Sequence, residues 1–152
     1  MNSMADSGAL YDRLIVDRAR TPLYAGRLEL ADGQGEGKNP LCGDKTRVEL
    51  RMADTHIGEV RHQTRGCAIC LAAADLMAER VVGQTVLQAR DLSQRFSAML
   101  VGEPASALDT NTDKTALGPL EAFAPLRAHR ARIRCAELPW VALKEALSHV
   151  DV

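Results

Sequence analysis

Three cysteines and one aspartate, spread over more than ninety positions, carry the side chains best suited to metal or sulfur chemistry. Cys42 and Asp44 stand in a glycine-rich segment, and Cys67 and Cys135 follow much later in the chain. Gly43 separates the first two, so the backbone can fold tightly enough for both side chains to face one point. Three thiolates and one carboxylate form a donor set that suits a tetrahedral Zn²⁺ ion.

The surroundings of these residues favour the ionised forms. Cys67 begins an expected helix, where exposed N–H groups and the helix dipole stabilise a thiolate. Arg132 and Arg134 closely precede Cys135 and also favour the anion. Each arginine is either a solvated surface charge or a hydrogen-bond donor to a ligand. Asp44 is an unusual partner for sulfur, and the hard carboxylate is the easier ligand to displace, as in a site that must open.

A fourth cysteine, Cys70, forms a Cys-x-x-Cys pair with Cys67. The two residues are expected on one face of a helix, but the parallel sheet that surrounds such a pair in thioredoxin-like folds is not predicted. We favour the interpretation that Cys70 is a small apolar residue at a contact between helix and sheet. The alternatives are a secondary sulfur acceptor, a resolving thiol or an alternative metal ligand.

The elements that must position these residues follow from periodicity and turn chemistry. Apolar residues at helical spacing over 8–20 predict a first helix that begins at Asp6 or Ser7 and ends before Pro22. Residues 31–45 hold four glycines and an Asn-Pro step, and we predict a loop there. Alternating apolar and polar residues predict two strands, over 47–52 and 57–65, joined by a turn at 54–56.

Helical patterns dominate the second half of the chain. One helix is predicted from Cys67 to Val82, closed by Gly83, and another from Thr85 to Gly102. Residues 103–119 are polar and predict a loop. Residues 120–150 predict two short helices, with Pro139 and Trp140 in the first turn of the last one and Trp140 as its packing anchor. Four scattered histidines are expected on the surface: His56, His62, His129 and His149.

This order of elements predicts an α+β fold in which helices pack on one face of a small antiparallel sheet. The length of 152 residues suits one domain, 1–152, with residues 1–6 expected to be flexible. The net charge of −1 argues against nucleic-acid binding. No apolar run is long enough to span a membrane, and the polar start does not resemble a secretory signal, so a cytoplasmic protein is expected. Cysteines in that compartment favour metal or thiol chemistry over disulfides.

Three segments, "NPLCGD", "RGCAICLAAADLM" and "ARIRCAELPW", resemble the iron–sulfur assembly proteins of the IscU and NifU N-terminal type. The resemblance runs from about residue 10 to residue 148, in the order and spacing of that family. Two features resemble its SufU branch. Arg134 stands before the third cysteine, where the IscU branch has a histidine and a nearby Leu-Pro-Pro-Val-Lys segment, and residues 103–119 match a SufU insertion.

The resemblance implies a zinc ion held by Cys42, Asp44, Cys67 and Cys135, with Gly43, Gly66, Arg132 and Arg134 in support. It also implies that Cys42 accepts persulfide sulfur from a SufS-type cysteine desulfurase, for a downstream cluster scaffold or apo iron–sulfur proteins. Such sulfurtransferase activity would belong to the pair of proteins rather than to a free-standing enzyme. One alternative is a scaffold that assembles and transfers a transient [2Fe–2S] or [4Fe–4S] cluster. Another is a thiol redox protein that uses Cys67 and Cys70.

Overall fold

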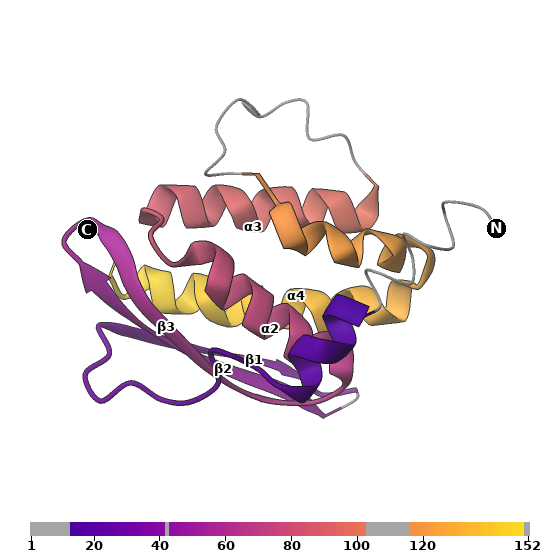
Figure 1. The fold of residues 1–152 in the computed structure, drawn as a ribbon, viewed down its shortest axis with the longest axis horizontal. Helices are drawn as coiled ribbons and strands as arrows, with labels where there is room; N and C mark the ends of the chain where they lie inside the picture. The colour runs from indigo at the N-terminus through magenta and orange to yellow at the C-terminus, as the bar shows by residue number, and fades with distance from the viewer. Residues whose placement is uncertain (1–12, 42, 103–115, 151–152) are drawn as a thin grey trace.

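The computed structural model describes residues 13–41, 43–102 and 116–150, and its described part is an antiparallel sheet covered by helices on one face (Figure 1). The strand order is β1-β2-β3. The α+β class predicted from the sequence is confirmed. A helix over 13–20 comes first and ends before Pro22 as predicted. The other elements are β1 (Gly33–Asn39), β2 (Asp44–Ala53), β3 (His56–Arg65), α2 (Ala68–Val81), α3 (Val86–Val101), the 3₁₀ segment η3 (Gly118–Ala128) and α4 (Arg130–Ser148).

The glycine-rich segment corrects the first prediction, because residues 33–39 form the edge strand β1 rather than a loop. Its glycines alternate, and they face the backbone of α4. A Cβ at Gly35 would stand 2.2 Å from the carbonyl oxygen of Ala142, and Gly33 and Gly37 meet α4 almost as closely. The glycines therefore let a helix lie directly on the strand. The Asn-Pro step does form a turn, immediately after β1.

The hairpin of β2 and β3 follows the predicted alternation, with the turn where it was expected. Val48 and Leu50 are fully buried on the helix side. Ile57 and Val60 are also fully buried although they are three positions apart. A β-bulge explains this spacing, because the pairing register shifts where β3 passes Arg51 and Met52 of β2.

The two middle helices are confirmed with nearly the predicted bounds. Cys67 is the N-cap of α2, and Gly83 follows its last residues with a positive φ of 88°. Thr85 caps α3 in a capping box with Gln88. The proposed caps Asp6 and Ser7, and residues 103–115 of the predicted insertion loop, lie outside the described residues.

The C-terminal prediction of two short helices was wrong in its second half. Of the two C-terminal helical elements, η3 is short. The other, α4, runs unbroken over nineteen residues, with Pro139 in its interior rather than in its first turn. A proline has no N–H to donate to the carbonyl four residues earlier, which here belongs to Cys135. Trp140 is buried and stacks on Phe96 with 5.3 Å between ring centroids, which confirms its role as a packing anchor.

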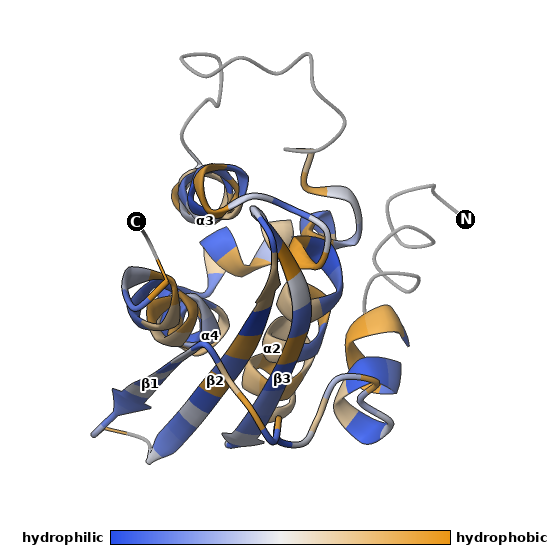
Figure 2. Cartoon of the chain, turned by 90° about the vertical axis from the view of Figure 1, so that its left-hand side faces the viewer, coloured by the Kyte–Doolittle hydropathy of each residue, from blue (hydrophilic) through white to orange (hydrophobic). Residues whose placement is uncertain are grey.

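The helices form two layers above the sheet. α4 packs on β1 and β2, while α2 packs on β3. Figure 2 shows α2 and α4 on one side of the sheet, with α3 beyond them. The core between these layers is largely aliphatic, as the low aromatic content predicts. Within the described residues, none of the helices combines the length and the apolar character needed to cross a membrane.

Candidate metal centre

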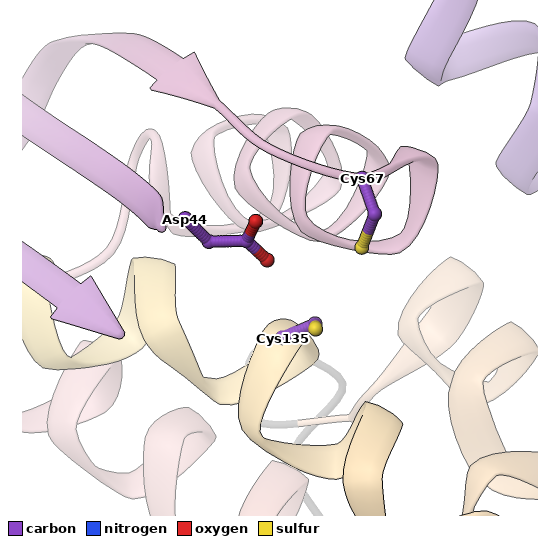
Figure 3. Close-up of side chains that lie close together, drawn as sticks. All are labelled: Asp44, Cys67 and Cys135. Carbon is purple, nitrogen blue, oxygen red and sulfur yellow. The ribbon is translucent and has the colours of Figure 1, made fainter. Parts of the chain in front are cut away.

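Asp44, Cys67 and Cys135 converge at one end of the sheet, each from a different element (Figure 3). Asp44 is the first residue of β2, Cys67 is the N-cap of α2, and Cys135 lies in the second turn of α4. One carboxylate oxygen and the two sulfur atoms all lie within 4.8 Å of one another. Residues separated by more than ninety positions thus offer three ligand atoms around one point.

Asp44 is buried in a way that calls for a cation. Its exposed fraction is only 7%, and its Oδ2 atom is buried without a hydrogen-bond donor among the described residues. A buried carboxylate oxygen without a partner is costly in a folded protein and therefore requires an explanation. A bound metal ion at this point would supply the missing partner.

The position of that carboxylate requires a glycine at residue 66. A Cβ at Gly66 would stand 2.7 Å from Cγ of Asp44 and 2.8 Å from its Oδ1 atom. No side chain larger than hydrogen fits there without displacing Asp44. The supporting role expected for Gly66 thus has a steric basis.

The turn before Asp44 is held by its own hydrogen bonds. Asn39 accepts a bond from the backbone N–H of Leu41 through its side chain, at 3.1 Å, and another from the N–H of Gly43 through its carbonyl, at 2.8 Å. Gly43 has a φ of +77°, a region that a glycine adopts without strain. Cys42, the predicted sulfur acceptor, lies outside the described residues.

The electrostatics of the centre resist the accumulation of negative charge. Burial raises the pKa of the Cys135 thiol, and hydrogen bonds and charges from Cys67 and Asp44 raise it further. Closely spaced acidic groups cannot all ionise without a compensating cation. Sulfur and oxygen donors of this kind fit a zinc ion, which would displace the thiol proton on binding.

Cys70 and the two arginines stand apart from this group of ligands. Cys70 is fully buried one turn into α2, and the ligand group found among the described residues does not include it. Arg132 and Arg134 are exposed on α4. Within the described part of the chain, neither arginine has a hydrogen bond to Asp44, Cys67 or Cys135.

His62 is the histidine for which the surface prediction was wrong. Its exposed fraction is 1%, and its Nε2 atom lies 3.0 Å from Oδ1 of the fully buried Asp75 on α2. The other three histidines are exposed, as predicted. A signal was present, because His62 occupies an inward position of the β3 alternation and Asp75 an inward position of an apolar helix.

Asp75 collects donors from three segments of the chain. The backbone N–H groups of Leu23 and Tyr24 bond its two oxygens at 3.0 and 2.7 Å, and Arg18 lies 3.2 Å from Oδ2. Burial alone would raise the pKa of Asp75, but the hydrogen bonds from His62 and the two backbone groups outweigh it and lower that pKa. The network therefore fastens the first helix and the segment after it onto α2 and β3.

A small antiparallel sheet with two helical layers and a cysteine–aspartate group at one end defines a class of α+β domain whose grouped side chains suit metal or sulfur chemistry. The sequence match makes this specific, because the NifU-like N-terminal domain family matches residues 10–136. The chain belongs to that family, as its three motif segments predicted.

Two relatives and one solved structure show the breadth of this similarity. The chain is 31% identical to the iron–sulfur cluster assembly scaffold protein IscU of Thermotoga maritima, over 93% of this chain and 95% of that protein. It is 28% identical to the zinc-dependent sulfurtransferase SufU of Bacillus subtilis, over 97% and 96%. A crystal structure from Fervidobacterium islandicum, described as a candidate scaffold for the SUF system, matches with a TM-score of 0.80 and 29% identity, over 91% of this chain and 97% of that one.

Proposed function

We propose that this chain works in iron–sulfur cluster assembly as a zinc-bound acceptor of persulfide sulfur from a SufS-type cysteine desulfurase. The observation that carries the proposal is the convergence of Asp44, Cys67 and Cys135, together with the buried Oδ2 atom of Asp44 that has no hydrogen-bond partner among the described residues. The similarity to the zinc-dependent sulfurtransferase SufU, which extends over nearly the whole chain, supports it. The thiol chemistry needs a reducing compartment, so the proposal includes a cytoplasmic location.

Four residues would hold the zinc ion: Cys42, Asp44, Cys67 and Cys135. A bound zinc ion keeps thiols deprotonated at neutral pH and shields them from oxidation. Asp44 supplies the hard donor in an otherwise soft set, and we infer that its bond is the easiest to release. Such a site can open when a partner protein presents a competing ligand.

Cys42 is the sulfur acceptor in this proposal. It stands beside Gly43 in the short connection between β1 and β2, and both of its chain neighbours are exposed. Cys67 and Cys135, in contrast, are held by α2 and α4. The Cys42 thiolate attacks the outer sulfur of a cysteine persulfide on the desulfurase. A new sulfur–sulfur bond forms on Cys42 while the desulfurase cysteine leaves as a thiolate.

The test combines metal analysis with sulfur transfer. We expect freshly purified protein to contain about one zinc per chain, and a SufS-type desulfurase fed with radiolabelled cysteine to label it. Cys42→Ala should remove the label, whereas Leu87→Ala, at a position that is 78% exposed on α3, should keep it. Equal labelling of Cys42→Ala would exclude Cys42 as the acceptor.

A second candidate function is cluster scaffolding, because the relative from Thermotoga maritima carries that name. The same four residues would then hold a transient [2Fe–2S] or [4Fe–4S] cluster before its transfer to apo proteins. Anaerobic reconstitution with iron and sulfide, in the presence of competing zinc, separates the two functions. Visible cluster absorption that persists against zinc would favour the scaffold; a colourless protein that retains zinc would favour the sulfur acceptor.

A further inference from the structure

The Cys67–Cys70 pair occupies the start of α2, where Cys67 packs against the small cluster that contains Cys70. Cys67 is the N-cap, with φ −72° and ψ 169°, and Cys70 is the third residue of the helix. Side chains three positions apart on a helix have Cβ atoms roughly 5–6 Å apart, and a disulfide needs about 3.5–4.5 Å. The extended backbone at Cys67 lies outside the helical spiral, so the helical spacing does not fix the separation of the two sulfur atoms.

The surroundings of Cys70 hold its sulfur beside the metal centre but outside the ligand group. Cys70 is fully buried and shares a small cluster with Cys135 and Leu138, against which Cys67 packs. This cluster is separate from the main core. The hydroxyl of the buried Thr46, on β2, lies 3.5 Å from the Cys70 sulfur. A polar contact of this kind positions the thiol more specifically than apolar packing alone would.

We propose that Cys70 is a resolving thiol that releases sulfide from a persulfide carried on Cys67. This inference rests on the proposed function only in assuming that the chain carries sulfane sulfur. It adds a reductive step that acceptance on Cys42 does not include. Cys67 is then shared between the metal centre and a dithiol–disulfide couple.

The step balances without any further reactant. The Cys70 sulfur attacks the inner sulfur of the Cys67 persulfide, and a Cys67–Cys70 disulfide forms as the bond to the outer sulfur breaks. The outer sulfur leaves as hydrosulfide and takes the proton of the Cys70 thiol. It is reduced by two electrons, and the two cysteine sulfurs together lose those electrons. A second turnover requires a dithiol reductant to open the disulfide again.

The chain offers a direct assay, because tryptic cleavage after Arg65 and Arg80 gives one peptide that contains Cys67 and Cys70 but neither Cys42 nor Cys135. Metal-free full-length protein is treated anaerobically with inorganic polysulfide and freed of excess reagent, and the sulfide it releases is trapped with a bimane. We expect about one sulfide per chain. Peptide 66–80 should then be about 2 Da lighter than its dithiol form, as a disulfide requires.

Cys70→Ala should reduce sulfide release by about tenfold or more and leave Cys67 as a persulfide, about 32 Da heavier. Cys70→Ser replaces the thiol with a hydroxyl that can still hydrogen-bond to Thr46, and it should behave like Cys70→Ala. Leu87→Ala, at a position that is 78% exposed on α3, is the control and should still release sulfide. Circular dichroism of each variant confirms that it is folded.

Two results would overturn the proposal. One is release at the parental level from either Cys70 variant, and the other is a parental peptide 66–80 that never loses about 2 Da. The second result concerns the parent protein alone, so it stands even if a variant misfolds. Polysulfide needs neither the desulfurase nor Cys42. Failure here therefore leaves sulfur transfer to Cys42 untouched, and failure of that transfer leaves this test intact.

Discussion

At the scale of single residues, the metal centre depends on the absence of a side chain at Gly66. In Gly66→Ala the new Cβ would meet Cγ of Asp44 at 2.7 Å and push the carboxylate out of the ligand group. We expect zinc affinity to fall by about 10- to 100-fold, the usual cost of disturbing the groups that orient a ligand. Competition with a zinc-binding dye measures it. Gly83→Ala is the control, because that glycine lies in open space. Its replacement should lower stability but leave the zinc affinity unchanged. Unchanged affinity in Gly66→Ala would contradict the steric role.

Cys135 gives the metal-free protein a dependence on alkaline pH. The fold raises the pKa of this thiol above its ordinary value of 9.0. A raised pKa means that the folded state holds the proton more tightly, so this contribution is complete below pH 9 and is lost as the pH rises further. Urea unfolding between pH 8 and pH 10 should show falling stability, by at most about 1.4 kcal/mol per pH unit from this group. Cys135→Ser should flatten that part of the curve; an equal slope in this variant would assign the effect to other groups.

The residues of the centre were easier to predict than its setting. Asp44, Cys67 and Cys135 were predicted because thiols and carboxylates are few and their motifs are distinct. His62 was not, since a histidine on a strand is usually polar surface; the inward positions of His62 and Asp75 were a signal, but their pairing follows only from the packing of α2 on β3. The placement of Cys42 remains a prediction.

At the scale of elements, β1 and α4 are the parts that local sequence rules misjudged. Alternating glycines have no apolar signature, so β1 was interpreted as a loop. In the structure, the α4 backbone lies so close to each of these glycines that no side chain would fit. Pro139 was placed at a helix start, where proline is favoured. Burial of the residues on both sides of it keeps α4 continuous instead. In both cases a tertiary contact outweighed the local preference.

The contact between β1 and α4 can be tested at Gly35. In Gly35→Ala the added Cβ would stand 2.2 Å from the carbonyl oxygen of Ala142, so α4 must move away from the sheet. We expect the free energy of unfolding to fall by about 1–3 kcal/mol, which is typical of overpacking. Zinc affinity should fall as well, because α4 carries Cys135. Chemical denaturation and the zinc competition assay measure the two effects. Lys38→Ala, on the exposed face of the same strand, should change neither; a Gly35→Ala protein of parental stability would show that the helix is not held this closely.

At the scale of the whole molecule, Asp75 joins the N-terminal segment, residues 18–24, to the sheet and to α2, which both contribute to the metal centre. Its partners come from the first helix, from the segment after it and from β3. The lowered pKa of Asp75 means that its contribution to stability is present above its ordinary value of 3.8 and is lost as the pH falls through the lower folded value. Acid should therefore release the N-terminal segment as this carboxylate gains a proton.

Asp75→Asn tests that connection at neutral pH. The variant removes the buried charge that Arg18 faces. Its free energy of unfolding should fall by about 3–5 kcal/mol, as expected when one partner of a buried pair is removed. Hydrogen exchange at the amides of Leu23 and Tyr24, which bond Asp75 directly, should quicken more than exchange in α3. Glu79→Gln is the matched control, because Glu79 pairs with the same Arg18 but is 35% exposed, and it should cost less than about 1 kcal/mol. If Asp75 only attaches this segment, its loss should quicken exchange only at the residues that it holds. Equal acceleration of exchange throughout the protein would mean instead that Asp75 supports the global fold.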